Sequence, residues 1–230
     1  MILDIIAYFT FFILSDYLLK FINIQGRYYC NHFMANMIMV YQTLPDTIYC
    51  YTNFESVGEY PQNYSAMSIV FALHFYHMAV YYYKLRYEDW LHHIIMIFFT
   101  LPLTLFLECG AILGHCIFFT TGLPGGVDYF LLFLVRNRLI HRYIEKEINT
   151  RLNLWIRCPG CISNVTICLL YFFKQHDTTM MTYFNYFSFL FIIISVYWNG
   201  IYFMERVVSD YAKIAYKPDY IVNKSNLACT

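Results

Sequence analysis

Charged residues are scarce in this chain, and neither sign dominates. Asp, Glu, Lys and Arg make up 13% of the 230 residues, against about 25% in ordinary globular domains, and 15 basic residues balance 15 acidic ones. The chain therefore has neither the basic field typical of nucleic-acid-binding proteins nor an acidic tail. Hydrophobic residues make up 60%, above the roughly 45–50% of globular domains, which argues against a soluble fold.

Several long apolar runs contain no charged residue at all, and one of them extends from Met180 to Met204. A bilayer core about 30 Å thick requires about 20 such residues in a helix. The sequence therefore predicts an all-α polytopic membrane bundle of about seven transmembrane helices. We place these helices at residues 2–23, 30–52, 65–84, 90–107, 110–136, 153–173 and 181–204.

The basic residues sort to one side when the seven predicted helices alternate across the membrane, and only Lys174 falls on the other side. The positive-inside rule makes the basic side cytoplasmic, with the N-terminus outside and the C-terminus inside. We accordingly assign residues 1–206 to a transmembrane domain and residues 207–230 to a cytoplasmic tail. The sorting also requires that the segment 122–126 be a kink or an unwound turn within a single crossing.

Ionisable side chains within the predicted spans are the first candidates for function, because they are costly to place in lipid. Asp89 lies three and four residues before His92 and His93, so it shares a helix face with either of them. His74 and His77 share one face of the preceding helix. The rise of 1.5 Å per residue in an α-helix places His92 and His93 within about 5 Å of the cytoplasmic boundary and His77 and Asp128 roughly 10 Å deep, so we expect these four positions at similar depth on the same side.

The segment Gly122-Leu-Pro-Gly-Gly-Val-Asp128 combines a proline, which lacks an N–H group, with glycines that let the backbone unwind. A helix resuming after such a break would present free N–H groups and a positive dipole end at membrane depth. Two interpretations stay open at this point. Asp128 caps the resumed helix, or Gly125, Gly126 and Asp128 line a pocket for a lipid headgroup or an acyl carbonyl.

Two chemistries suit a group of histidines in a membrane. A neutral imidazole can take a proton from an amine or a hydroxyl, or can itself be acylated. A di-iron oxidase is the metal alternative, but such enzymes carry several H-x-x-H-H or H-x-x-x-H boxes. This sequence has one His-His pair and an isolated His74-x-x-His77, so we predict no metal site. Hydrogen bonding between helices for packing is the alternative without chemistry.

Two of the eight cysteines form the motif Cys158-Pro-Gly-Cys161, a spacing shared by redox pairs and by half of a zinc site. No second C-x-x-C accompanies it, and the motif falls near the predicted cytoplasmic end of the sixth helix. We therefore expect a plain loop with two reduced thiols at this place.

The stretch Tyr87-Glu-Asp-Trp-Leu-His-His-Ile-Ile-Met-Ile resembles the TLC-domain family, which includes the ceramide synthases and the translocon-associated TRAM proteins. The likeness consists of a His-His pair at the start of a membrane helix, an acidic residue shortly before it, and a preceding helix rich in Phe and Tyr. Together with the span number it covers about residues 1–206. The resemblance implies six core helices around a lipid-sized cavity, usually with one additional helix, in the endoplasmic reticulum or a related endomembrane.

In ceramide synthases the His-His pair is required for N-acylation of a sphingoid base by acyl-CoA, so the resemblance implies that His92 and His93 are catalytic. We add Asp89 as the orienting group and expect a substrate-binding role for His74, His77, Gly125, Gly126 and Asp128. The chain lacks the later acidic run H-D-x-x-D of the synthases. It therefore resembles the smaller members of the family that are not synthases.

The leading hypothesis is a multi-pass protein that handles membrane lipids and affects membrane lipid homeostasis. If it is an enzyme, the expected reaction is an acyl-CoA-dependent N- or O-acylation of a lipid. Acyl-CoA is then a co-substrate, and no bound cofactor is expected. The alternative is a non-catalytic membrane adaptor or a cargo or lipid chaperone. Membrane lipids are the expected partners, and nucleic acid is not.

Overall fold

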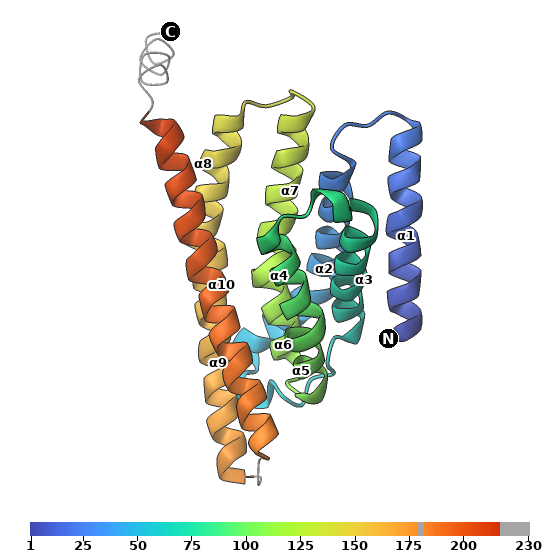
Figure 1. The fold of residues 1–230 in the computed structure, drawn as a ribbon. Helices are drawn as coiled ribbons and strands as arrows, with labels where there is room; N and C mark the ends of the chain where they lie inside the picture. Colours follow the sequence, from blue (N-terminus) through green and yellow to red (C-terminus); the bar gives the residue numbers. More distant parts are fainter. Residues whose placement is uncertain (179–181, 217–230) are drawn as a thin grey trace.

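The computed structural model describes residues 1–178 and 182–216, which form helices and no β-strand. Four long helices are uninterrupted: α1 (Ile2–Phe21), α2 (Arg27–Thr52), α3 (Tyr64–Tyr81) and α10 (Tyr183–Ala215). Three more are built from two α-helical parts joined without a break by a π-helical turn (Figure 1). Their parts are α4 (Tyr87–Ile95), η3 (Met96–Thr100) and α5 (Leu101–Phe106); α6 (Ala111–Ile117), η4 (Phe118–Gly122) and α7 (Leu123–Arg136); and α8 (Arg142–Leu152), η5 (Asn153–Arg157) and α9 (Cys158–Thr178). Short 3-10 turns lie at η1 (Phe54–Ser56) and η2 (Tyr82–Lys84).

Proline explains where the π-helical turns lie. η3, η4 and η5 each end two residues before a proline, at Pro102, Pro124 and Pro159 respectively. A proline inside a helix removes one backbone hydrogen bond, and its ring collides with the carbonyl of the residue four positions earlier. A π-helical turn relieves this collision, because its hydrogen bonds span five residues instead of four. The three helices therefore pass their prolines without ending.

The segment 122–126 is part of one continuous helix, as the sorting of the basic residues requires. The expected unwound turn with free N–H groups is wrong, because the Leu123 N–H donates to the Phe118 carbonyl across η4. The donors that would have formed a binding element are thus used within the helix.

Two of the predicted boundaries are also wrong, since the helices continue further on the basic side than their apolar runs do. The sixth helix begins at Arg142 and not near residue 153, and α10 continues to Ala215. The predicted loop at Cys158–Cys161 is helical as well, being the first turn of α9. Both thiols are free and buried. Residues 217–230 of the predicted tail lie outside the described residues.

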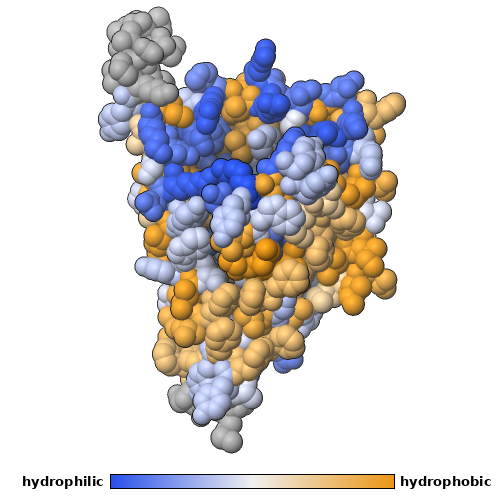
Figure 2. Space-filling view, viewed as in Figure 1, coloured by the Kyte–Doolittle hydropathy of each residue, from blue (hydrophilic) through white to orange (hydrophobic). Residues whose placement is uncertain are grey.

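Within the described residues, five helices are long and apolar enough to cross a membrane. They are Ile2–Phe21, Tyr87–Phe106, Ala111–Arg136, Arg142–Lys174 and Tyr183–Ala215. These helices bury little of their apolar surface within the protein, and in α1 only 11% of the most apolar window is buried. Figure 2 shows a continuous apolar surface below a hydrophilic end. A soluble bundle would bury such side chains, so this surface is that of an integral membrane protein.

The core consists of two apolar clusters, one among α1, α2, α3 and α6 with Leu101 of α5, and the other among α5, α6, α9 and α10 with Cys50 of α2. α2 is central and contacts α1, α3, α6 and α7. Its polar side chains find partners on these neighbours or beside them: Asn31 donates to the Tyr76 hydroxyl at 2.8 Å, and Asp46 accepts from Asn63 at 2.8 Å. Such residues lower the hydropathy of α2, as two histidines do in α3, and neither helix is among the five apolar ones.

Gly160 in the first turn of α9 brings this helix close to η4. A Cβ atom at Gly160 would overlap the ring of Phe119. The residue must be glycine for a steric reason, although its backbone is ordinary helix. The Cys158–Cys161 segment is therefore a site of close helix packing.

We expect Gly160→Ala to destabilise the protein by about 1–3 kcal/mol, the usual cost of overpacking a tight core. Thermal unfolding of the purified protein in detergent measures the change. The double variant Gly160→Ala/Phe119→Ala should be less sensitive to the added methyl than the single variant, because the ring that it meets is gone. Gly126→Ala is the matched control, since the added carbon there meets the flexible Met37 side chain. Equal loss of stability at both glycines would contradict this packing.

Candidate functional site

The structure brings together the four histidines that the sequence singled out. His74 and His77 come from α3, and His92 and His93 come from α4, which follows α3 after a short connection. The ring centroid of His74 lies 5.3 Å from that of His92 and 5.1 Å from that of His93. The His77 and His93 centroids are 4.7 Å apart. We call these residues, with His32 of α2, the histidine cluster.

His32 is the member of the histidine cluster that sequence reasoning missed. Its ring lies 5.7 Å from the ring of His77 and stacks between Tyr28 and Tyr129, at centroid distances of 4.2 and 4.3 Å. Spacing within α2 could not place it in the cluster, because only Tyr28 is a neighbour from α2, whereas His77 comes from α3 and Tyr129 from α7. A buried histidine in the second apolar run was the one available signal.

The hydrogen bonds of the histidine cluster are few. His74 Nδ1 lies 2.8 Å from the Val70 carbonyl, and a carbonyl only accepts, so Nδ1 is the protonated nitrogen. His74 Nε2 and both ring nitrogens of His93 have no hydrogen-bond partner in the described part of the chain. His93 is only 4% exposed, whereas His92 is exposed. Interhelical hydrogen bonding thus does not account for these rings.

Asp89 sits at the start of α4, where it closes a capping box with Arg86. Its carboxylate accepts from the Arg86 backbone N–H at 3.0 Å and from Arg86 Nε at 3.4 Å. Among the described contacts it makes no hydrogen bond to a histidine. The orienting role of Asp89 stays a prediction, and its observed function is to cap the helix that carries His92 and His93.

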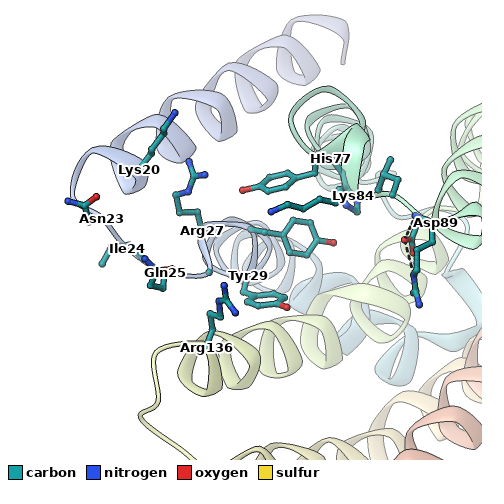
Figure 3. A pocket seen from close by; sticks show the side chains of 15 residues that line it. Lys20, Asn23, Ile24, Gln25, Arg27, Tyr29, His77, Lys84, Asp89 and Arg136 are labelled. Atoms are coloured by element: carbon teal, nitrogen blue, oxygen red, sulfur yellow. Dashed lines mark hydrogen bonds and ion pairs between the residues drawn. The ribbon is translucent and has the colours of Figure 1, made fainter.

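A pocket of about 730 Å³ opens beside the histidine cluster at the basic end of the bundle (Figure 3). His77 belongs both to its lining and to the cluster. Asp89 is the only acidic residue among those that line it. Five cationic side chains surround it, from α1, α2, the α3–α4 connection and α7: Lys20, Arg27, Lys84, Arg86 and Arg136. The pocket therefore suits an anion next to the imidazoles.

One of these cations is held in place by a buried acid in α1. Asp16 Oδ2 pairs with Arg27 Nη1 at 2.8 Å. Its other oxygen, Oδ1, accepts from the hydroxyls of Tyr76 at 3.0 Å and Tyr81 at 2.7 Å. An acid within the first apolar run was visible in the sequence, but the three donors come from α2 and α3. This network fixes Arg27 at the wall of the pocket.

The structure places Asp128, Gly125 and Gly126 away from the histidine cluster. Asp128 accepts from Asn149 of α8 at 2.6 Å. The two glycines lie against α2, where added Cβ atoms would meet Asn36 and Met37. The contact of α7 with the cluster comes instead from Tyr129. These three residues thus hold helices together and show no contact with the candidate site.

Arg157 at the end of η5 donates hydrogen bonds to a backbone carbonyl that Pro124 leaves without its usual helical donor. Thr120 lies four residues before Pro124, so its carbonyl lacks the usual helical donor. Arg157 donates to this carbonyl from Nη2 at 2.7 Å and from Nε at 3.2 Å. Its guanidinium also stacks over Phe203 of α10 at 4.4 Å. One side chain therefore connects three of the long helices.

We expect Arg157→Lys to destabilise the protein by roughly 1–3 kcal/mol, because an ammonium group cannot reproduce the paired donation and leaves a buried carbonyl short of a partner. Thermal unfolding in detergent checks this. Arg151→Lys is the control, since Arg151 makes an exposed ion pair with Glu147 and should tolerate the change. An unchanged unfolding temperature for Arg157→Lys would show that the guanidinium geometry does not matter.

Comparison of the chain with protein-family models, curated proteins and solved structures found no match.

Proposed function

We propose that the chain is a multi-pass membrane protein of lipid metabolism, with seven crossings, that transfers an acyl group to a lipid amine or hydroxyl at the histidine cluster. The observation that carries the proposal is the shared position of His77, which lines the basic pocket and contacts His93. This arrangement offers an anion site beside imidazole nitrogens that have no hydrogen-bond partner among the described residues. The resemblance of the α4 segment to the TLC domain supports the same reading and an endomembrane such as the endoplasmic reticulum.

The basic pocket fits the phosphate groups of acyl-CoA, since Lys and Arg are the usual phosphate ligands. The acyl chain would extend along the apolar helices. The amine or hydroxyl of the acceptor lipid attacks the thioester carbonyl, the carbon–sulfur bond breaks, and the CoA thiolate leaves. An imidazole of the His92–His93 pair takes the proton of the attacking group as the base. His77 connects this pair to the pocket.

The double variant His92→Ala/His93→Ala should change the ceramide or phospholipid profile of cells that express the protein, because it removes the base. We expect the profile to return to that of cells without the protein. Lipid mass spectrometry at matched expression provides the measurement. His141→Ala is the matched control, as His141 is exposed at the start of α8 and away from the cluster. A variant profile identical to wild type would replace the enzyme with a non-catalytic adaptor or lipid chaperone.

Seven crossings require the two chain ends to lie on opposite sides of the membrane. α2 and α3 pack against other helices of the bundle, and the five basic residues that line the pocket lie together at one end. We expect an epitope tag at the N-terminus to be luminal and a tag at the C-terminus to be cytoplasmic. Protease protection in sealed microsomes distinguishes them. Both tags on the same side would mean an even number of crossings and would overturn the topology.

A further inference from the structure

The histidine cluster contains a group of three whose geometry the acyl-transfer proposal does not use. One ring nitrogen from each of His74, His92 and His93 lies within 4.8 Å of the others. Two of these residues are adjacent on α4 and the third faces them from α3. No spacing within a single helix reveals this group, because the ligands come from two helices.

The hydrogen bonding of His74 prepares one nitrogen for a metal ion. Its Nδ1–H donates to the Val70 carbonyl at 2.8 Å, which fixes the tautomer and leaves a lone pair on Nε2. That Nε2 is buried and has no hydrogen-bond partner in the described structure. Metal-binding histidines usually donate their other N–H to a carbonyl or carboxylate in this way.

His93 supplies a second independent indication. His93 is only 4% exposed, and neither its Nδ1 nor its Nε2 has a hydrogen-bond partner among the described residues. A buried polar atom without a partner destabilises the fold, so a ring with two such atoms is a poor packing element. Coordination of an ion would satisfy one of these nitrogens.

Although the sequence alone predicted no metal site, we propose from this geometry that His74, His92 and His93 bind a divalent transition-metal ion, with Zn²⁺ as the natural occupant. Three imidazoles with an open fourth position form the donor set of many catalytic zinc sites. Zn–N bonds of about 2.0–2.1 Å place tetrahedral ligand atoms about 3.4 Å apart, so the rings must close slightly around the ion. The exposed member of the three is His92, and the closure would fall mainly on it.

The inference goes beyond the proposed function, because ion binding does not depend on any lipid reaction. An ion at these three nitrogens would supply Lewis acidity near the pocket. It would also occupy the pair proposed as the base, which leaves His77 as the free imidazole between the ion and the cationic wall. Ion binding and lipid acylation can therefore succeed or fail separately.

The experiment measures Co²⁺ and Zn²⁺ binding to the purified full chain in detergent, prepared with an affinity tag that contains no histidine. We expect one ion per chain and the visible absorption of four-coordinate Co²⁺. His74→Ala and His93→Ala should each weaken binding by about tenfold or more, since even loss of an outer partner of a ligand costs roughly 10–100-fold. His77→Ala and His141→Ala are controls and should keep the ion. Less than half an ion per wild-type chain, or equal loss in the controls, overturns the site.

A ligand exchange separates binding from folding. His92→Cys keeps a ligand atom at the exposed position and should give a thiolate-to-Co²⁺ charge-transfer band in the near ultraviolet. This band would not appear if the residue at position 92 had only a structural role. Wild-type Co²⁺ binding without this band in His92→Cys would remove His92 from the site. If the wild-type chain binds an ion but His92→Ala/His93→Ala leaves the lipid profile unchanged, the metal site is retained and acyl transfer is refuted. If the double variant changes the lipid profile but the wild-type chain binds no ion, acyl transfer is retained and the metal site is refuted.

Discussion

A polar group inside an apolar helical bundle must find its partner within the protein, because neither lipid nor water supplies one. This constraint accounts for most of the specific contacts in the structure. The Thr120 carbonyl, released by a proline, accepts from Arg157, and the Asp16 carboxylate collects donors from α2 and α3. The central helix α2 carries more polar residues than its neighbours and is surrounded by them. Helix positions are thereby fixed by a few polar contacts within a largely apolar core.

The histidine cluster departs from this constraint at several atoms in one place. His93, His74 and His32 keep buried nitrogens without hydrogen-bond partners in the described structure, and scattered oxygens such as Gln42 Oε1 and Glu145 Oε2 do the same. Of the unpaired buried atoms, the imidazole nitrogens gather at one place, and such a gathering needs a physical reason. A reacting group or a bound ion is such a reason, since both need a free lone pair. The adjoining cationic pocket gives an anionic molecule access to the same place.

The three π-helical turns connect the sequence to this arrangement. Each is placed by a proline, and each lets a long helix pass the interruption without leaving the bundle. η4 and η5 are connected by the hydrogen bond from Arg157 to the Thr120 carbonyl. η3 directly follows α4, the helix that carries His92 and His93. The prolines thus shape helices without ending them. The glycines pack helices closely, as Gly160 does against Phe119.

The sequence by itself determined the all-helical class, the approximate helix positions and the association of His74 with His77 and of His92 with His93. Uncharged runs and helical periodicity are local properties, so they can be read along the chain. Only the tertiary structure decided that α3 faces α4, that His32 joins the cluster, and that Asp128 turns toward Asn149. The expected free N–H groups at Gly122–Gly126 are absent because the helix continues through a π-helical turn, in which the Leu123 N–H donates to the Phe118 carbonyl. Contacts between helices depend on rotation about each helix axis and on the packing of neighbours, and no local pattern records either.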